Sequence, residues 1–384
     1  MRDAFQLDPS VVHLNHGSFG AVPRVVAEAQ QRVRDGAEAN PMRFFRVDSP
    51  GLKVEAREVG AAFLGVDADE LALVRNVTTS AAIVLGSLAA QGRLGPGDVV
   101  LLGEPGYESV RRTVDRWCAR TGSTYVVVPV GAGVTDHEVV RAFEDAVAQA
   151  PGRVRLVVVD AITSPTGAVL PYRAICELAR AAGALSMVDA AHVPGHVPAL
   201  PADSGADFWT GTWHKWCFAP RGTTALWAAE PERATLQPLT TSWNHGQPYP
   251  LPFDTAGTDD YSGWYALGTA IRFWEDAGGL EIGKRASSML DDAAALLSSV
   301  VGSPSDVPVP ACPSPSLRLV PLPHGVADDE PSADRLYQAL SAQQVEEQVV
   351  SYRGHGYVRL SGAVYNEPSD YERLADILPG TLAG

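Results

Sequence analysis

The stretch VRLVVVDAITSPTGAVLPYRAICELARAAGALSMVDAAH, residues 154–192, predicts the fold of this chain. It begins and ends with short apolar runs that lack polar alternation, VRLVVVDAI (154–162) and ALSMVDAAH (184–192). Such runs are typical of strands that are buried on both faces of a parallel sheet. YRAICELARAAG (172–183) between them predicts a helix. We therefore expect a strand–helix–strand unit with a right-handed crossover.

The same alternation continues on both sides of this unit, from about residue 70 to residue 230. Further strands are predicted at LALVRN (71–76), VVLLGE (99–104) and TYVVVPV (124–130), and further helices at TTSAAIVLGSLAAQ (78–91), YESVRRTVDRWCART (107–121) and HEVVRAFEDAVAQA (137–150). Strands and helices that alternate at this spacing indicate an α/β protein with a mostly parallel sheet between helices. Ligands of such sheets bind beyond the carboxyl ends of the strands.

The rest of the chain predicts a second, smaller domain. A Pro/Gly-rich stretch (244–260) is followed by helices at about 262–277 and 279–301, and then by a Pro/Ser-rich linker (302–316). Beyond it we expect a small α+β unit with strands LRLVPLP (317–323), VEEQVVSYR (345–353) and YVRLSG (357–362), and helices SADRLYQALSAQ (332–343) and SDYERLADIL (369–378). We predict an N-terminal segment 1–25 near the site, a large domain 26–300 and a small C-terminal domain 301–384.

Composition limits the possible partners. The 384-residue chain carries a formal charge of −15, which disfavours nucleic acid and anionic membranes as partners. We expect no signal peptide and no membrane span, because the N-terminus is polar and no apolar run is long enough. The four cysteines are scattered and include no CxxC pair, which favours a cytoplasmic protein without disulfides or a metal site.

Polar side chains follow several predicted strands. Asp189 ends one strand and His192 follows it, while Asp160 ends another. From position alone, Asp189 is either a helix-start residue or a ligand-binding carboxylate, and both interpretations stay open. Thr78, Thr79 and Ser80 open a predicted helix, where they could cap the helix or help its free N–H groups to bind a phosphate.

FWTGTWHKWCFAPRG (208–222) places Lys215 among apolar residues. An apolar setting lowers the pKa of a lysine, so more of its amine is neutral and nucleophilic. Such an amine forms a Schiff base with an aldehyde, and pyridoxal phosphate carries an aldehyde, a phosphate and a ring nitrogen that pairs with a carboxylate. A phosphate-binding helix start, then Asp189, then Lys215 are the three parts that this cofactor needs.

With these residues in place, the chain resembles the class V aminotransferase-like family of fold-type-I pyridoxal-phosphate enzymes, in its isopenicillin N epimerase-like branch, which is related to the cysteine desulfurases. The resemblance runs in order through most of the chain, in LNHGSFGAVP (14–23), NPMRFFR (40–46), LVRNVTTS (73–80), DAITSPTGAVLP (160–171), VDAAHVPG (188–195), FWTGTWHKWCFAPRGT (208–223) and VRLSGAVYN (358–366). It implies a sheet of the seven-stranded type in the large domain.

The resemblance also implies roles around the cofactor, pyridoxal 5'-phosphate. Lys215 would form the internal aldimine and act as acid and base at Cα, and Asp189 would keep the ring nitrogen protonated. Tyr107 would stack on the opposite ring face. His192 and Ser164 would lie near the ring hydroxyl, and the phosphate contacts would be Thr78, Thr79, Thr212 and His214.

Further implied roles concern the substrate and a second subunit. Arg359 would bind the α-carboxylate of an amino-acid substrate, through a bidentate pair. Thr258 would reach the phosphate of a neighbouring subunit, which implies a homodimer with shared sites. Asn15, His16, Asn40 and Arg43 lie in family-like segments near the expected substrate entrance, and His355 precedes Arg359.

The resemblance favours an epimerase-like reaction through an aldimine and a quinonoid, as part of specialised metabolism. A carbon–sulfur lyase remains open because β-elimination needs one base, whereas epimerisation needs a second acid. Decarboxylation and transamination are further alternatives. Persulfide transfer is disfavoured, because neither Cys217 nor Cys312 lies on a loop like that of the desulfurases. A non-catalytic module that binds the cofactor is the least favoured interpretation.

Overall fold

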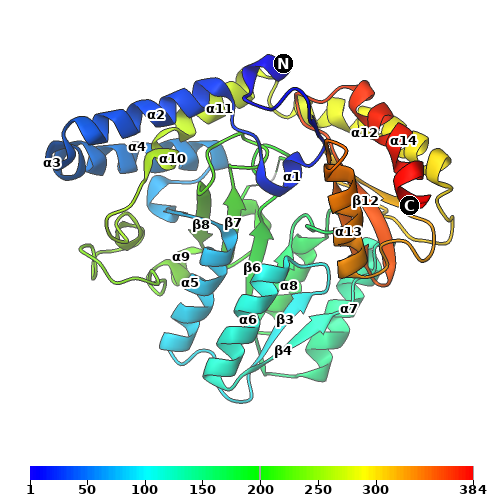
Figure 1. Cartoon of the computed structure of the whole chain (residues 1–384). Helices are drawn as coiled ribbons and strands as arrows, with labels where there is room; N and C mark the ends of the chain where they lie inside the picture. The colour runs from blue at the N-terminus through cyan, green and yellow to red at the C-terminus, as the bar shows by residue number, and fades with distance from the viewer. Residues whose placement is uncertain (199, 384) are drawn as a thin grey trace.

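A mostly parallel sheet forms the centre of the molecule (Figure 1). The computed structural model describes residues 1–198 and 200–383. Over these residues the main sheet has seven strands in the order β2-β8-β7-β6-β5-β3-β4. Its strands are β2 (Leu71–Val74), β3 (Val99–Gly103), β4 (Thr124–Val128), β5 (Val154–Asp160), β6 (Leu185–Ala190), β7 (Phe208–Thr212) and β8 (Thr224–Ala228). β8 pairs antiparallel with both β2 and β7, and the remaining pairs are parallel. The predicted α/β fold with a mostly parallel sheet is confirmed.

Each strand of this sheet contributes to two hydrophobic cores. In β3, Val99 and Leu101 pack into one core and Val100 and Leu102 into the other, and all four are buried. Successive side chains of a strand point to opposite faces, so a continuous apolar run suits a strand that is covered on both sides. One face is covered by α5 (Val77–Ala90) and α6 (Glu108–Thr121), and the other by α7 (Asp136–Gln149) and α8 (Tyr172–Ala181).

The N-terminal helices form an arm beside the sheet, drawn in blue in Figure 1. Two later helices pack against α2 and α4 of this arm. The arm and its neighbours are α1 (His16–Phe19), α2 (Arg24–Ala39), α3 (Pro41–Arg43), a π-helical turn (Phe44–Asp48), α4 (Ser49–Leu64), α10 (Ser262–Tyr265) and α11 (Leu267–Asp276). The short helix α9 (Glu230–Arg233) follows β8 and lies beside α5 in Figure 1. Single 3-10 turns lie at Arg2–Ala4, Ala68–Glu70, Ala202–Ser204 and Leu251–Phe253.

The C-terminal part has its own sheet and core. Strands β9 (Leu317–Pro321), β11 (Gln348–Tyr352) and β12 (His355–Ser361) form an antiparallel sheet in the order β11-β12-β9. Its core is shared with α12 (Glu281–Val301), α13 (Glu330–Ser341) and α14 (Pro368–Ala383). The predicted boundary near residue 300 remains a prediction, and residue 384 lies outside the described residues.

The N-terminal segment joins this C-terminal part. β1 (Val12–His13) pairs in parallel with β10 (Val345–Glu346). The sequence predicts one strand over residues 345–353, but the chain interrupts it at the fully buried Glu347. One half therefore pairs with the N-terminal segment and the other half with β12, which carries Arg359.

No helix among the described residues is both long enough and apolar enough to cross a membrane.

Candidate active site

Lys215 lies in the turn that follows β7, at the carboxyl edge of the sheet. Its side chain is half-buried, and its Nζ lies 2.8 Å from Nε2 of His192, which follows the neighbouring strand β6. Burial lowers the pKa of Lys215 to about 8; the carboxylate of Asp189 opposes this effect and the charge of Arg359 adds to it. The neutral amine, which is the form that attacks an aldehyde, is therefore accessible near neutral pH.

Two carboxylates lie side by side at the same edge of the sheet. Asp160 ends β5 and Asp189 lies in β6, and the two are partners in the parallel register. Burial raises the pKa of Asp189 to about 6, and burial together with Asp189 raises the pKa of Asp160 well above its usual range. The sequence predicted Asp160 only as a strand end, not as a neighbour of Asp189.

One oxygen of Asp189 lacks a hydrogen-bond partner. Oδ1 accepts a bond of 3.0 Å from the backbone N–H of Ala191, whereas Oδ2 is buried and has no partner among the described residues. An unpaired buried carboxylate oxygen costs free energy unless a donor is supplied from outside the chain. A protonated pyridine nitrogen is such a donor, so the residues present fit pyridoxal phosphate.

The start of α5 lies against β7, the strand that precedes Lys215. The hydroxyl of Thr210, in β7, donates a bond of 2.7 Å to Ser80 Oγ in α5. Asn76 caps this 14-residue helix, because its Oδ1 accepts from Thr79 N at 2.8 Å and from Thr79 Oγ1 at 3.0 Å. The predicted caps, Thr78, Thr79 and Ser80, instead lie within the first turn. Asn76 was missed, although an Asn three residues before a Thr is a recognisable capping signal.

Two residues expected at the phosphate, Thr212 and His214, differ in whether they have an atom available to bond a ligand. Thr212 Oγ1 donates its proton to the carbonyl of Ala191 at 2.8 Å, so this hydroxyl has no proton left for a phosphate. His214 is half-buried and its Nδ1 has no partner among residues 1–198 and 200–383. Burial lowers the pKa of His214 to about 4, and the positive charge of Lys215 lowers it further. Of the two, His214 keeps an atom available for a ligand.

Arg359 is a buried cation whose partners are neutral. It lies in β12 with 3% of its surface exposed, and its pKa is lowered to about 10 by burial. Nη1 donates to the backbone carbonyl of Ser164, and Nη2 donates to Asn15 Oδ1 at 3.0 Å and to Ser18 Oγ at 2.9 Å. Its Nε has no partner. The buried Glu347 is near enough to oppose the effect of burial on the Arg359 pKa, but no carboxylate of the described chain forms an ion pair with Arg359. This arrangement leaves the guanidinium ready for an external carboxylate.

Tyr107 lies at the N-cap position of α6 with 44% of its surface exposed. The glycine before it is required by close packing, since a Cβ on Gly106 would lie 2.9 Å from the carbonyl oxygen of Gly103 and 3.1 Å from Asp160 Oδ2. Gly106 therefore has a packing role beside Asp160.

His16 lies beside the backbone of Lys215. It is 2% exposed, its Nε2 lies 2.9 Å from the carbonyl oxygen of Lys215, and its Nδ1 lies 3.2 Å from the hydroxyl of Tyr365. Both ring nitrogens thus have protein partners, and a contact between His16 and substrate remains a prediction. His16 supports the backbone of Lys215.

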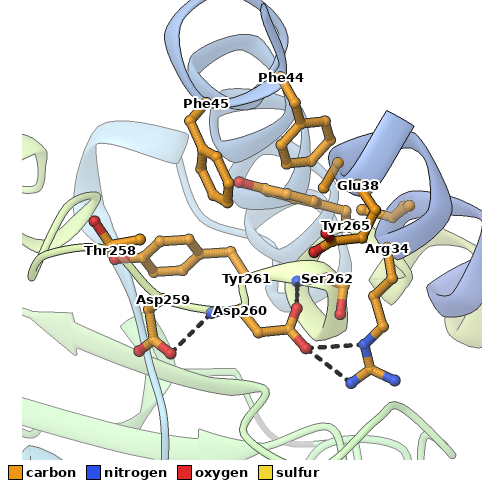
Figure 2. A pocket seen from close by; sticks show the side chains of 12 residues that line it. Arg34, Glu38, Phe44, Phe45, Thr258, Asp259, Asp260, Tyr261, Ser262 and Tyr265 are labelled. Carbon is orange, nitrogen blue, oxygen red and sulfur yellow. Dashed lines mark hydrogen bonds and ion pairs between the residues drawn. The ribbon is translucent and has the colours of Figure 1, made fainter. Parts of the chain in front are cut away.

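Four other expected residues lie apart from the Lys215 cluster within this chain. Arg43 is exposed at the end of the N-terminal arm and pairs with Asp48 at 3.5 Å, while Asn40 caps α3 by accepting from Arg43 N. Thr258 is exposed and lines a pocket of about 400 Å³ beside the arm, as Figure 2 shows. His355 precedes Arg359 by four residues, which separates the two by about 13 Å along β12.

Several residues that the sequence analysis did not select complete the site. Ser18 holds Arg359, and Trp216 donates from Nε1 to His192 Nδ1 at 3.3 Å. His196 stacks on Trp216 with ring centroids 4.3 Å apart. The position of Trp216, directly after the lysine, was the only signal that could have found it.

A lysine with a lowered pKa and an unpaired carboxylate, both at the strand ends of a mostly parallel sheet, define the class of fold-type-I pyridoxal-phosphate enzymes. Comparison with known proteins gives the family. The chain belongs to the Aminotransferase class-V family, whose family model matches residues 21–329. Pyridoxal phosphate is the cofactor of this family, and the prediction of an enzyme with this cofactor is confirmed.

The relatives include both reaction types that the sequence left open. The chain is 33% identical to putative L-cysteine desulfhydrase 1 of Oryza sativa subsp. japonica, covering 98% of this chain and 84% of that protein. It is 31% identical to isopenicillin N epimerase of Streptomyces clavuligerus, covering 98% and 96%. Among solved structures, it resembles a C-DES mutant with glycine covalently linked to its pyridoxal-phosphate cofactor, with a TM-score of 0.81, 20% identity and 99% coverage of both chains.

Proposed function

We propose that the protein is a pyridoxal-phosphate-dependent carbon–sulfur lyase that acts on cysteine or an S-substituted cysteine. The observation that carries this proposal is the pairing of Lys215 Nζ with His192 Nε2 at 2.8 Å, a single acid–base centre, together with the unneutralised Arg359. β-Elimination needs one base at Cα and a leaving group at Cβ, so one such centre is enough for it.

Several residues would hold the cofactor. Asp189 Oδ2 would accept from the ring nitrogen, and the start of α5 together with His214 would bind the phosphate. His192 and Ser164 would lie near the ring hydroxyl, and Tyr107 would cover the ring face opposite Lys215. When bound, the cofactor withdraws electrons from the Cα of the substrate and so acidifies its Cα–H bond.

The chain's own groups would then orient the substrate. Arg359 would pair with the α-carboxylate through its Nη atoms and its free Nε, and Asn15 and Ser18 hold the guanidinium plane in place. Because this plane is fixed before substrate arrives, little orientational freedom remains to be lost on binding.

Lys215 would carry the proton chemistry. Its neutral amine takes the Cα proton, the Cβ–S bond breaks, and the sulfur leaves with the electron pair of that bond. An S-substituted cysteine and one water thus give a thiol, pyruvate and ammonium, with no oxidant or reductant. His192 would donate its Nε2–H to the neutral amine and so keep Lys215 Nζ oriented between turnovers.

Epimerisation is the second candidate, and the exposure of Tyr107 favours it. A proton returned to the opposite face of Cα needs an acid on that side, and Tyr107 would be positioned to supply one from solvent. The relatives named isopenicillin N epimerase support this alternative at 31% identity.

We also propose a cytoplasmic homodimer in which Thr258 faces the neighbouring subunit. Four free cysteines are compatible with a reducing compartment. In Figure 2, Phe45 and Tyr261 border the pocket beside Thr258. Phe45, Met42 and Val47 are exposed large apolar side chains of the same arm, and apolar surface of this kind is common at subunit interfaces.

One experiment separates the two reactions. The purified enzyme is incubated in deuterated water with L-cysteine, S-methyl-L-cysteine and a panel of other L-amino acids, and the products are analysed by NMR and chiral chromatography. Pyruvate with hydrogen sulfide or methanethiol supports the lyase, whereas a D-amino acid with deuterium at Cα supports the epimerase. Absence of both products across the panel would overturn the proposal.

A further inference from the structure

The hydrogen bonds around His192 have directions that the chemistry of the donors determines. The indole nitrogen of Trp216 can only donate, and it lies 3.3 Å from His192 Nδ1. His192 Nδ1 must therefore accept, and a neutral imidazole that accepts at Nδ1 carries its proton on Nε2. That Nε2 lies 2.8 Å from Lys215 Nζ.

We infer that Trp216 is a positioning residue that holds His192 in its Nε2–H tautomer, so that His192 donates to the neutral amine of Lys215. An ammonium at Lys215 would bring two donors together at 2.8 Å. Protonation of Lys215 therefore requires that either the Lys215–His192 bond or the Trp216–His192 bond be given up. Trp216 thus favours the neutral, nucleophilic lysine. The inference deepens the proposed function, because it concerns the same lysine.

A second histidine holds Trp216 in this position. His196 stacks on the indole of Trp216, with an interplanar angle of 29°. Its own tautomer is also determined, since Ser316 N donates to His196 Nε2 at 2.9 Å and the carbonyl of His192 accepts from Nδ1 at 2.9 Å. Ser316 directly precedes β9, so this chain of bonds links the C-terminal sheet to Lys215.

The surroundings of His192 keep it neutral. It is 2% exposed, and the charged and titratable groups that face it are Lys215, Arg359, His196 and His214. Burial and these neighbours lower the pKa of His192 well below its usual range. Around neutral pH the His192 ring therefore stays uncharged. A change in the protonation of Lys215 can alter only which ring nitrogen of His192 carries the proton.

The small number of lysines makes a direct test practical. The chain has three, Lys53, Lys215 and Lys284. In full-length protein without cofactor, labelled with ¹³C at the lysine Cε, the Lys215 signal is identified by elimination with Lys53→Arg and Lys284→Arg. Its titration is then followed by NMR in wild type and in Trp216→Phe. We expect the Lys215 midpoint to rise by about one pH unit in Trp216→Phe, the loss of roughly one hydrogen bond.

Trp213→Phe is the matched control. Trp213 is fully buried two residues before Lys215, and its Nε1 has no partner among the described residues. We expect its Lys215 midpoint to match that of wild type. The Trp216→Phe shift should also vanish in a His192→Ala background. An unchanged midpoint in Trp216→Phe, an equal shift in Trp213→Phe, or a shift that persists without His192 would overturn the inference.

A measurement on wild type keeps the inference testable if Trp216→Phe does not fold. In ¹⁵N-histidine-labelled protein, with His192 assigned by His192→Gln, the nitrogen shifts must be those of the Nε2–H tautomer, and an Nδ1–H pattern would overturn it. Neither measurement needs cofactor or substrate. A failed lyase assay would therefore leave this result intact, and the reverse also holds.

Discussion

Arg359 and Asn15 lie 344 residues apart in the sequence, yet Nη2 of the arginine lies 3.0 Å from Oδ1 of the asparagine. The other contacts of the guanidinium are a serine hydroxyl and a backbone carbonyl. A buried charge held only by neutral groups is incompletely compensated. The N-terminal segment thus orients the cation without neutralising it, which supports the proposal that Arg359 binds a substrate carboxylate.

Replacing this cation should separate substrate binding from cofactor binding. In Arg359→Ala, we expect KM for the amino acid to rise roughly 100-fold, because a buried charge-assisted pair is lost. The cofactor dissociation constant should change little, and fluorescence titration measures it. Arg353→Ala is the control, since Arg353 pairs with Glu104 at the surface of the same sheet. Equal losses of substrate and cofactor affinity would contradict the role of Arg359.

The role of the Lys215 amine can be tested by the visible absorption of the lysine-bound cofactor. Lys215→Ala should lose the visible absorption of the lysine-bound cofactor and at least about 1000-fold of kcat, because the base at Cα is removed. Lys284→Ala should retain both, since Lys284 is an exposed residue paired with Glu281. A Lys215→Ala protein with wild-type absorption would show that another amine binds the aldehyde.

The unpaired carboxylate should impose a pH dependence on stability in the cofactor-free protein. Burial raises the pKa of Asp189 to about 6, so the folded state holds a proton that the unfolded state releases above its ordinary pKa near 4. The free energy of unfolding should therefore fall as pH rises through this interval. Asp189→Asn should remove the contribution of Asp189 to this decline, leave that of the neighbouring Asp160, and gain on the order of 2 kcal/mol over wild type at pH 7.

Urea denaturation of the cofactor-free proteins between about pH 4 and pH 7 measures this difference. Asp207→Asn is a useful comparison, because Asp207 Oδ2 accepts from Ser186 N at 2.7 Å and is not left unpaired. Parallel curves for wild type and Asp189→Asn would contradict the assignment of an ionised, unpaired Asp189.

Two glycines with the same backbone conformation test the packing beneath Lys215. Gly20 and Gly92 have φ of 67° and 68°, so alanine is strained to a similar degree at both. A Cβ on Gly20 would lie 2.1 Å from the carbonyl oxygen of His214, whereas nothing lies within 4 Å of a Cβ on Gly92. Gly20→Ala should cost about 1–3 kcal/mol more than Gly92→Ala and weaken cofactor binding.

Thermal unfolding and cofactor titration of both variants measure these effects. Similar losses in the two proteins would mean that Gly20 is required only for its backbone conformation, not for its approach to His214.

The sequence was sufficient for much of the main sheet, because strands buried on both faces appear as continuous apolar runs. It was less informative about β8, whose direction depends on the connection from β7. The connection from Thr212 to Thr224 is too short for the crossover that a parallel pair requires, and this signal could have predicted the antiparallel pairing. The break at Glu347 left no local sign, since β10 pairs with the distant N-terminal segment whereas β11 pairs with the adjacent β12.

The sequence was likewise sufficient for some features of the candidate site and not for others. Asp189 and Lys215 could be placed because strand order brings their strand ends to one edge. The state of each polar group could not be predicted, because it depends on a partner elsewhere in the chain. Thr212 gives its proton to Ala191, 21 residues away, and His16 is occupied by Lys215 and Tyr365. Both were expected to contact ligands, and only the fold shows the protein groups that they bond to.

The pairing of β1 with β10 has a consequence for biosynthesis. Val12 aligns with Val345, and Arg359 follows on β12, so the residues that orient the guanidinium are synthesised hundreds of residues before it. The central sheet, which ends at Ala228, can assemble on the ribosome before Arg359 is synthesised. In a nascent chain of that length, Lys215 can reach its place at the sheet edge before the proposed carboxylate-binding group exists.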